Sequence, residues 1–133
     1  MRWLVDAFNV VGARPDGWWR DRPAAVRRLL DRLEAYAERT GEDVRVVLDS
    51  GPPDLAGRRG GVEVVIARTR GRDAADEEIA RLAAADTHPS TLTVVTSDSA
   101  LASRVRAAGT RVEGAGSFQR RLDDDIASPP GRA

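Results

Sequence analysis

Four acidic residues stand where an apolar run ends or where a helical pattern begins. They are Asp6, Asp49, Asp98 and Asp76. The first three each follow a run of apolar residues, and Asp76 opens a helical pattern. If those runs are parallel strands of one sheet, their carboxyl ends meet at one edge. Carboxylates brought together raise each other's pKa, and proteins usually group them to hold a hard cation such as Mg²⁺. The pattern predicts an acidic metal site.

Two polar side chains accompany these acids. Asn9 stands three residues after Asp6, so both side chains could offer oxygen ligands at one point. The alternative is a turn in which they bond to local backbone. Ser97 directly precedes Asp98, and both residue types are also preferred helix N-caps. The residues alone leave these alternatives open.

Three acids share the first turn of the helix predicted at about residues 74–85. Asp73, Asp76 and Glu77 could simply interact favourably with the helix dipole. Their spacing also allows Asp73 to cap the helix while Asp76 faces the sheet edge, which is the interpretation we favour. Asp49 has three open roles: metal ligand, partner of a ligand, or first residue of a turn.

Arginines flank the apolar run 62–67. They are Arg58, Arg59, Arg68, Arg70 and Arg72. Such charges on two nearby loops could neutralise the phosphates of a nucleic-acid strand, or form an ordinary solvated surface. The chain has no lysine, which excludes P-loop and Schiff-base mechanisms. Trp18 and Trp19 could stack on bases or cover the first long helix.

Composition limits the remaining possibilities. A chain of 133 residues fits one domain. The net charge of zero argues against a simple basic binding module, and the lack of cysteine excludes disulfides and thiolate metal sites. No stretch approaches the ~20 apolar residues of a membrane span, and no signal region precedes the first strand. We therefore expect a cytoplasmic protein without membrane contact.

The apolar patterns alternate between strand and helix. Strands are predicted at 2–6, 44–49, 62–67, 91–96 and 111–113, and helices at about 23–40, 74–85, 99–108 and up to residue 124. Residues 7–21 and 57–61 read as loops, and no helix joins the second strand to the third. The apolar runs are continuous, as in strands buried on both faces. This predicts a three-layer α/β domain over residues 1–125, with a mainly parallel sheet of about five strands, and a disordered tail at 126–133.

Four segments in order resemble one family. Residues 5–12, VDAFNVVG, resemble the opening VDGYNVIG of YacP-like NYN domains, which are PIN-like ribonucleases. Residues 75–79 resemble the family's helix start, and residues 94–98 its VVTSD segment. Residues 115–122 resemble its closing segment. The similarity extends over about residues 2–122.

The resemblance implies a Rossmann-like, PIN-like sheet and metal-dependent endonucleolytic cleavage of RNA. Asp6, Asp76 and Asp98 match the family's acidic core, and Asn9 matches its polar companion. The implied cofactor is Mg²⁺ or Mn²⁺. The implied partner is RNA, which for some members is ribosome-associated. Two departures stand out, because Ala7 replaces the family's usual glycine and Ala100 stands where many members carry a glutamate.

The leading hypothesis is therefore a Mg²⁺- or Mn²⁺-dependent endoribonuclease. The predicted metal ligands are Asp6, Asp76, Asp98 and Asp49. Asn9 and Ser97 would orient ligands or the phosphate, and Glu77 would be a ligand or take up a proton. The predicted RNA-binding residues are Arg58, Arg59, Arg70, Arg72 and Ser97.

Two alternatives belong to other classes. The first is a non-catalytic RNA- or ribosome-binding module with a degraded site, which Ala100 supports. The second is a phosphoacceptor domain of the receiver type, with Asp49 as acceptor. Its usual strand-end lysine is missing from this chain, which argues against it.

Overall fold

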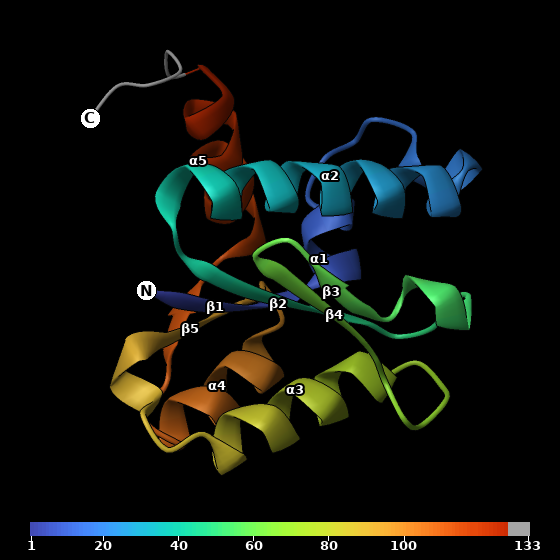
Figure 1. Cartoon of the computed structure of the whole chain (residues 1–133). Helices are drawn as coiled ribbons and strands as arrows, with labels where there is room; N and C mark the ends of the chain where they lie inside the picture. The colour runs from blue at the N-terminus through green and yellow to red at the C-terminus, as the bar shows by residue number, and fades with distance from the viewer. Residues whose placement is uncertain (128–133) are drawn as a thin grey trace.

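The computed structural model describes residues 1–127 as an α/β domain (Figure 1). Within this range, six strands form one sheet in the order β3-β4-β2-β1-β5-β6. The strands are β1 (Arg2–Asp6), β2 (Asp43–Leu48), β3 (Gly57–Arg59), β4 (Val62–Ile66), β5 (Leu92–Val95) and β6 (Arg111–Glu113). All neighbouring strands are parallel except β3 and β4, which are antiparallel. The mainly parallel sheet predicted from the sequence is confirmed.

Helices cover both faces of this sheet. They are α1 (Ala7–Gly12), α2 (Arg22–Thr40), α3 (Ala74–Ala85), α4 (Ser99–Ala107) and α5 (Ala115–Ala127), with short 3-10 turns η1 (Trp18–Arg20), η2 (Pro53–Leu55) and η3 (Pro89–Thr91). Figure 1 shows α1, α2 and α5 on one face and α3 and α4 on the other. The predicted three-layer architecture is therefore confirmed. None of the described helices is both long and apolar enough to cross a membrane.

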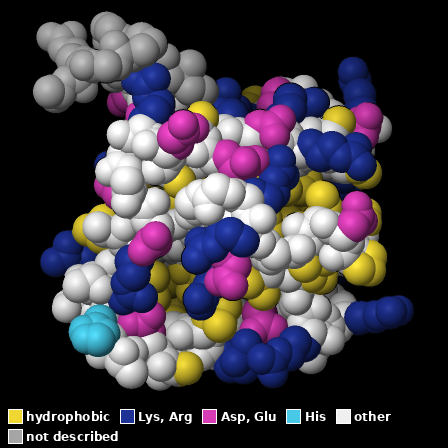
Figure 2. Space-filling view, in the orientation of Figure 1, with side chains coloured by type: hydrophobic (Ala, Val, Ile, Leu, Met, Phe, Trp, Pro, Cys, Tyr) yellow, Lys and Arg dark blue, Asp and Glu magenta, His cyan; other side chains and the backbone are white. Residues whose placement is uncertain are grey.

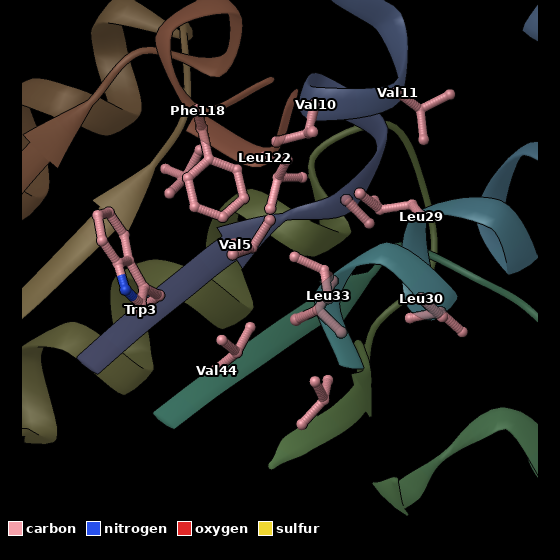
Figure 3. Packing of buried hydrophobic residues seen from close by; sticks show 14 of the residues in the cluster. Trp3, Val5, Val10, Val11, Leu29, Leu30, Leu33, Val44, Phe118 and Leu122 are labelled. Atoms are coloured by element: carbon pink, nitrogen blue, oxygen red, sulfur yellow. The ribbon is translucent and has the colours of Figure 1, made fainter. Parts of the chain in front are cut away.

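The two layers of helices bury alternate side chains of the same strands. Val5 packs with Leu33 and Phe118 in the cluster beneath α1, α2 and α5 (Figure 3). Leu4, its neighbour in β1, packs with Ile79 in the cluster beneath α3 and α4. Because successive side chains of a strand point to opposite faces, a strand buried on both faces needs a continuous apolar run. This holds the carboxyl end of β1 rigidly at the centre of the sheet.

The predicted loop at residues 7–21 is wrong in its first part. Residues 7–12 form α1, which begins directly after β1. Val10 and Val11 are buried in the cluster shared with α2 and α5. A helix of this length is marginal on its own, so its stability comes from this packing. Asp6 thereby occupies the N-cap position of α1.

The predicted loop at residues 57–61 contains β3. This strand pairs antiparallel with β4, with Arg58 opposite Glu63. The antiparallel strand returns the chain to the starting edge of the sheet, so β4 can run parallel to β2 without a crossover helix. β3 therefore explains both the missing helix and the sixth strand.

The predicted helix ends are largely confirmed. Asp21 caps α2 by accepting a hydrogen bond from the Ala24 amide, and Gly41 ends it with a φ of 72°. Asp73 stands at the N-cap of α3, but its side chain makes no capping hydrogen bond, so the predicted cap is wrong in that respect. The helix α5 continues to residue 127, two residues into the segment predicted as a tail, and residues 128–133 lie outside the described part.

Candidate active site

Three of the predicted acids approach each other at the edge where the parallel strands end. Asp6 ends β1, and Asp98 follows β5, the strand that pairs with β1 at Val5 and Val95. Asp76 comes from the first turn of α3 in the opposite layer. The site is thus assembled from two adjacent strands and one helix, at the edge where α/β folds bind ligands.

The electrostatics of Asp6 couple it to the other two acids. Asp6 is buried, with an exposed fraction of 5%. Burial, together with the nearby charges of Asp76 and Asp98, raises the pKa of its carboxyl to about 6, against hydrogen bonds from the Asn9 backbone and Thr96. Asp76 makes no side-chain hydrogen bond or ion pair with the other described residues. Desolvation, and then the charge of Asp98, raises the pKa of Asp76 too. The edge concentrates negative charge.

Thr96 connects two of these acids, although sequence reasoning did not assign it to the site. Its buried hydroxyl donates to Asp6 Oδ2 over 3.3 Å and accepts from the Asp98 backbone N–H over 3.1 Å. It therefore fixes the Asp6 carboxylate and the start of the Asp98 turn relative to each other. Its place at the end of β5, directly before Ser97 and Asp98, was the available signal.

Asn9 and Ser97 form a second link. The Ser97 backbone N–H donates to Asn9 Oδ1 over 2.7 Å, and the Ala115 N–H donates to Ser97 Oγ over 2.8 Å. These bonds join the starts of α1 and α5 to the end of β5. The oxygen of Asn9 is thus engaged by backbone 88 positions away, and not by the local backbone of a turn. Its role toward a metal or phosphate stays a prediction.

Asp98 has the capping role that the sequence offered for it, and its ligand role stays a prediction. Its Oδ1 accepts from the Leu101 N–H over 2.9 Å and caps α4. At the same time its charge contributes to the raised pKa values of Asp6 and Asp76. Capping uses one carboxylate oxygen, so it is compatible with a further role for the residue.

The two remaining predicted acids stand apart from this network. Glu77 is exposed and accepts two hydrogen bonds from Arg104 of α4, at 2.9 and 3.4 Å. This pairing lowers the pKa of the Glu77 carboxyl. Asp49 follows β2 at the same edge, where the Ser50 hydroxyl donates to it over 3.4 Å. Both contacts are local to their own part of the surface.

The predicted RNA-binding arginines separate into two groups. Arg70 and Arg72 lie exposed in the segment before α3, and neither makes an ion pair with a described residue. Arg59 is held by Asp31 and Glu34 of α2, at 3.1 and 2.8 Å. Arg58 lines a pocket with residues at the starts of β1 and β2, away from the acids. Figure 2 accordingly shows basic and acidic side chains interleaved on this face rather than one basic patch.

Glu78 anchors the segment that carries Arg70 and Arg72. Its buried carboxylate accepts from the Arg68 backbone N–H over 3.3 Å and pairs with Arg81. Sequence reasoning did not single it out, because an acid in the first turns of a helix also suits the helix dipole.

The acidic edge suits a divalent cation in its chemistry. Carboxylate oxygens are the ligands that Mg²⁺ and related hard cations prefer. Among residues 1–127, however, no three acidic, histidine or cysteine side chains are grouped so that they could hold a metal ion. The donors are therefore present and electrostatically coupled, but the structure does not gather them into one coordination sphere.

Comparisons with known proteins show the family and the fold of the chain. A family model described as the YacP-like NYN domain matches residues 3–128. The chain is similar to the crystal structure of Rae1 (YacP) from Bacillus subtilis, with a TM-score of 0.78 and 26% identity over 96% of this chain and 76% of that one. A Trp-to-Leu mutant of the same protein matches with a TM-score of 0.72 and 25% identity, over 96% and 77% of the two chains. No curated protein sequence matches the chain significantly.

Proposed function

Because the chain belongs to the YacP-like NYN domain family, a PIN-like nuclease family, we propose that it is a metal-dependent endoribonuclease. RNA would be cut at the edge of the sheet where β1 and β5 end. The observation that carries this proposal is the buried Asp6, whose pKa is raised by desolvation and by two neighbouring acids. Such perturbed groups cluster at functional sites. We propose that it acts in the cytoplasm, with ribosome-associated RNA among its substrates.

We assign the metal to the three coupled acids. Asp6, Asp76 and Asp98 would hold Mg²⁺ or Mn²⁺, with Asp49 as an additional acid at the same edge. When bound, such a cation lowers the pKa of a water molecule and offsets charge on the scissile phosphate. Its positive charge would also remove the mutual repulsion that raises the pKa values of Asp6 and Asp76.

The protein's own contribution is to hold these carboxylates in place. Thr96 donates to Asp6 and fixes the backbone at Asp98. Asn9 and Ser97 hold the turn that follows β5, and they would orient the phosphate from the exposed side of that turn. Glu77 pairs with Arg104. We propose that Glu77 keeps this guanidinium beside Asp76. The charge of Asp76 contributes to the raised pKa of Arg104.

The RNA backbone would be held by arginine. Arg70 and Arg72 are the best placed of the predicted set, because they precede α3 and have no carboxylate partner among the described residues. Contacts of this kind position the nucleic acid without reading its sequence. Arg58 and Arg59 lie on β3, so an RNA bound at the acidic edge would contact them only if it were long enough to extend to β3.

A non-catalytic RNA- or ribosome-binding module is the second candidate. Ala100 favours it, since many relatives carry an acid there. The absence of a gathered three-ligand group among the described residues also favours it. The two candidates differ in one outcome, which is cleavage.

The test is cleavage of single-stranded RNA in Mn²⁺ by the wild-type protein and by the Asp6→Asn and Asp98→Asn variants. A matched control is Asp86→Asn, which removes an acid from the opposite edge. We expect wild type and Asp86→Asn to cleave, and the other two to lose activity at least about a hundredfold, because ligand partners alone account for 10–100-fold. Equal cleavage by all four proteins would show that the site is assigned wrongly. RNA binding without cleavage in any divalent metal would favour the second candidate.

A further inference from the structure

A largely apolar pocket of about 200 Å³ opens between the start of α2, the end of β2 and η2. Its lining includes Phe8, Arg22, Val26, Arg27, Leu48 and Leu55. Figure 2 shows hydrophobic side chains at the surface on the right of the molecule, with basic side chains nearby. Figure 1 places the N-terminal half of α2 on that side. Ser50, whose hydroxyl donates to Asp49, also lines the pocket, but its other lining residues take no part in the contacts described for the acidic edge.

The pocket adjoins the acidic edge through two strands. Phe8 stands in the first turn of α1, two residues after Asp6. Leu48 directly precedes Asp49 at the end of β2. Because β1 and β2 are parallel neighbours, with Asp6 opposite Val47, the pocket lies beside the end of β1. If an RNA strand has one phosphate at Asp6, its next nucleotides would therefore lie near this pocket.

The lining of the pocket combines one flat ring with two arginine side chains. The guanidinium carbon of Arg22 lies 4.2 Å from the centroid of the Phe8 ring, in a cation–π contact. Neither Arg22 nor Arg27 forms an ion pair with a residue of the described chain, whereas Arg59 on nearby β3 binds two carboxylates. A largely apolar lining with two arginines that lack a carboxylate partner among the described residues is complementary to a nucleobase that is followed by its phosphates.

We propose that this pocket holds an unpaired base of the RNA strand that is cut at the acidic edge. The inference rests on the proposed function and narrows its substrate to single-stranded RNA, because a paired base would first have to leave its stack. Phe8 supplies the apolar surface and Arg22 the stacking plane. Arg22 and Arg27 neutralise the adjoining phosphates. Single-stranded nucleic acids are commonly held by this combination of stacking and charge.

The experiment measures how strongly the protein prefers bases to a bare backbone. An eight-nucleotide oligouridine and an eight-unit abasic oligomer of the same charge are titrated by fluorescence anisotropy, in EDTA so that nothing is cleaved. Leu55→Asp places a carboxylate in the pocket, and Phe8→Leu removes the ring while keeping an apolar side chain. Ala56→Asp is the matched control, since it adds the same charge at the next residue, outside the pocket lining.

We expect wild type and Ala56→Asp to bind oligouridine about tenfold more tightly than the abasic oligomer, as base stacking predicts. In Leu55→Asp the ratio should fall to about one, and in Phe8→Leu it should fall partway. The ratio cancels the electrostatic change, because both probes carry the same charge. If Phe8→Leu does not fold, as judged by circular dichroism, Leu55→Asp decides the result.

A wild-type ratio of one, or an unchanged ratio in Leu55→Asp, would overturn the proposal and leave the pocket to another apolar occupant, such as a partner's side chain. Wild-type protein that binds neither probe would overturn it as well. The nuclease proposal is judged separately by the Asp6→Asn cleavage assay. A protein that cleaves RNA but shows no base preference would retain the nuclease and lose the pocket assignment.

Discussion

At the edge of the sheet where β1 begins, Arg2 donates hydrogen bonds of 2.8 and 2.9 Å to the two carboxylate oxygens of Asp86. At the edge where β1 ends, Asp6 is buried beside Asp76 and Asp98, and no basic side chain forms an ion pair with it among residues 1–127. The bonds from Arg2 lower the pKa of Asp86 to about 2. Burial and neighbouring acids raise the pKa of Asp6 to about 6. At the start of β1, Arg2 thus pairs with an acid from the end of α3, whereas the acid that ends β1 has no basic partner among the described residues.

This difference separates an acid whose charge stabilises the folded state from an acid whose charge destabilises it. Asp86 gains stability from its charge, whereas the charge of Asp6 opposes folding. A buried acid whose charge destabilises the folded protein is best explained by a ligand that this charge binds. The comparison between the two edges therefore supports the functional assignment, and it can be tested by mutation.

The largest expected effect is an opposite change of stability at the two edges. Asp6→Asn should raise the free energy of unfolding at pH 7 by about 1–3 kcal/mol, because it removes a charge whose pKa lies above its ordinary value. Asp86→Asn should lower it by about 1–2 kcal/mol, because charge-assisted hydrogen bonds to Arg2 are lost. Urea unfolding measures both values. A change of the same sign in the free energy of unfolding of both variants would contradict the comparison.

The two effects should also depend on pH in different windows. The carboxyl of Asp6 has a folded pKa of about 6 against an ordinary 3.8, so its destabilisation appears as the pH rises from about 4 to 6. The gain from Asp6→Asn should therefore vanish below about pH 4. Asp86 has a folded pKa of about 2, so its stabilisation is present above about pH 4 and is lost as the pH falls toward 2. Unfolding free energies at pH 3, 5 and 7 would show whether the windows differ.

A smaller effect should distinguish the two ends of β5. Thr96→Val removes the hydroxyl that donates to Asp6 and accepts from the Asp98 N–H. We expect RNA cleavage to fall about tenfold, as for other residues that orient metal ligands. Thr93→Val is the control, because that buried hydroxyl contacts the sulfur of Met1 at the other edge. Equal cleavage rates for the two variants would remove Thr96 from the site.

The smallest effect is expected at Glu77. Its carboxylate is exposed and bonded to Arg104, so Glu77→Gln should change the cleavage rate less than about threefold, as surface ion pairs contribute little. Steady-state cleavage rates of this variant and of Asp76→Asn make the comparison within one helical turn. A loss as large as that of Asp76→Asn would restore Glu77 to the catalytic group.

The sequence predicted the elements that rest on long, regular patterns. Continuous apolar runs located β1, β2, β4 and β5, and the helical spacing located α2. It missed α1 and β3, because segments of six and three residues are too short to show a period. Both depend on packing or pairing with distant parts of the chain.

The candidate site divides in the same way. Asp6, Asp76 and Asp98 could be predicted, because strand ends and a helix start fix where they lie. Thr96 could not, since its role depends on Asp6, which is 90 positions away. Glu77 was predicted as a ligand or proton acceptor next to Asp76, and its partner Arg104, which belongs to another helix, could not be foreseen. The partner of a long side chain is set by tertiary structure, which local spacing does not reveal.

The most direct test of the acidic edge is its affinity for Mn²⁺, measured by isothermal titration calorimetry. Wild type and Asp86→Asn should bind Mn²⁺ with equal affinity, because Asp86 lies at the opposite edge. Asp6→Asn should weaken binding at least about tenfold, as expected when an oxygen ligand and its charge are removed. Equal affinities in all three proteins, or no binding in wild type, would contradict the assignment of Asp6 to a metal site.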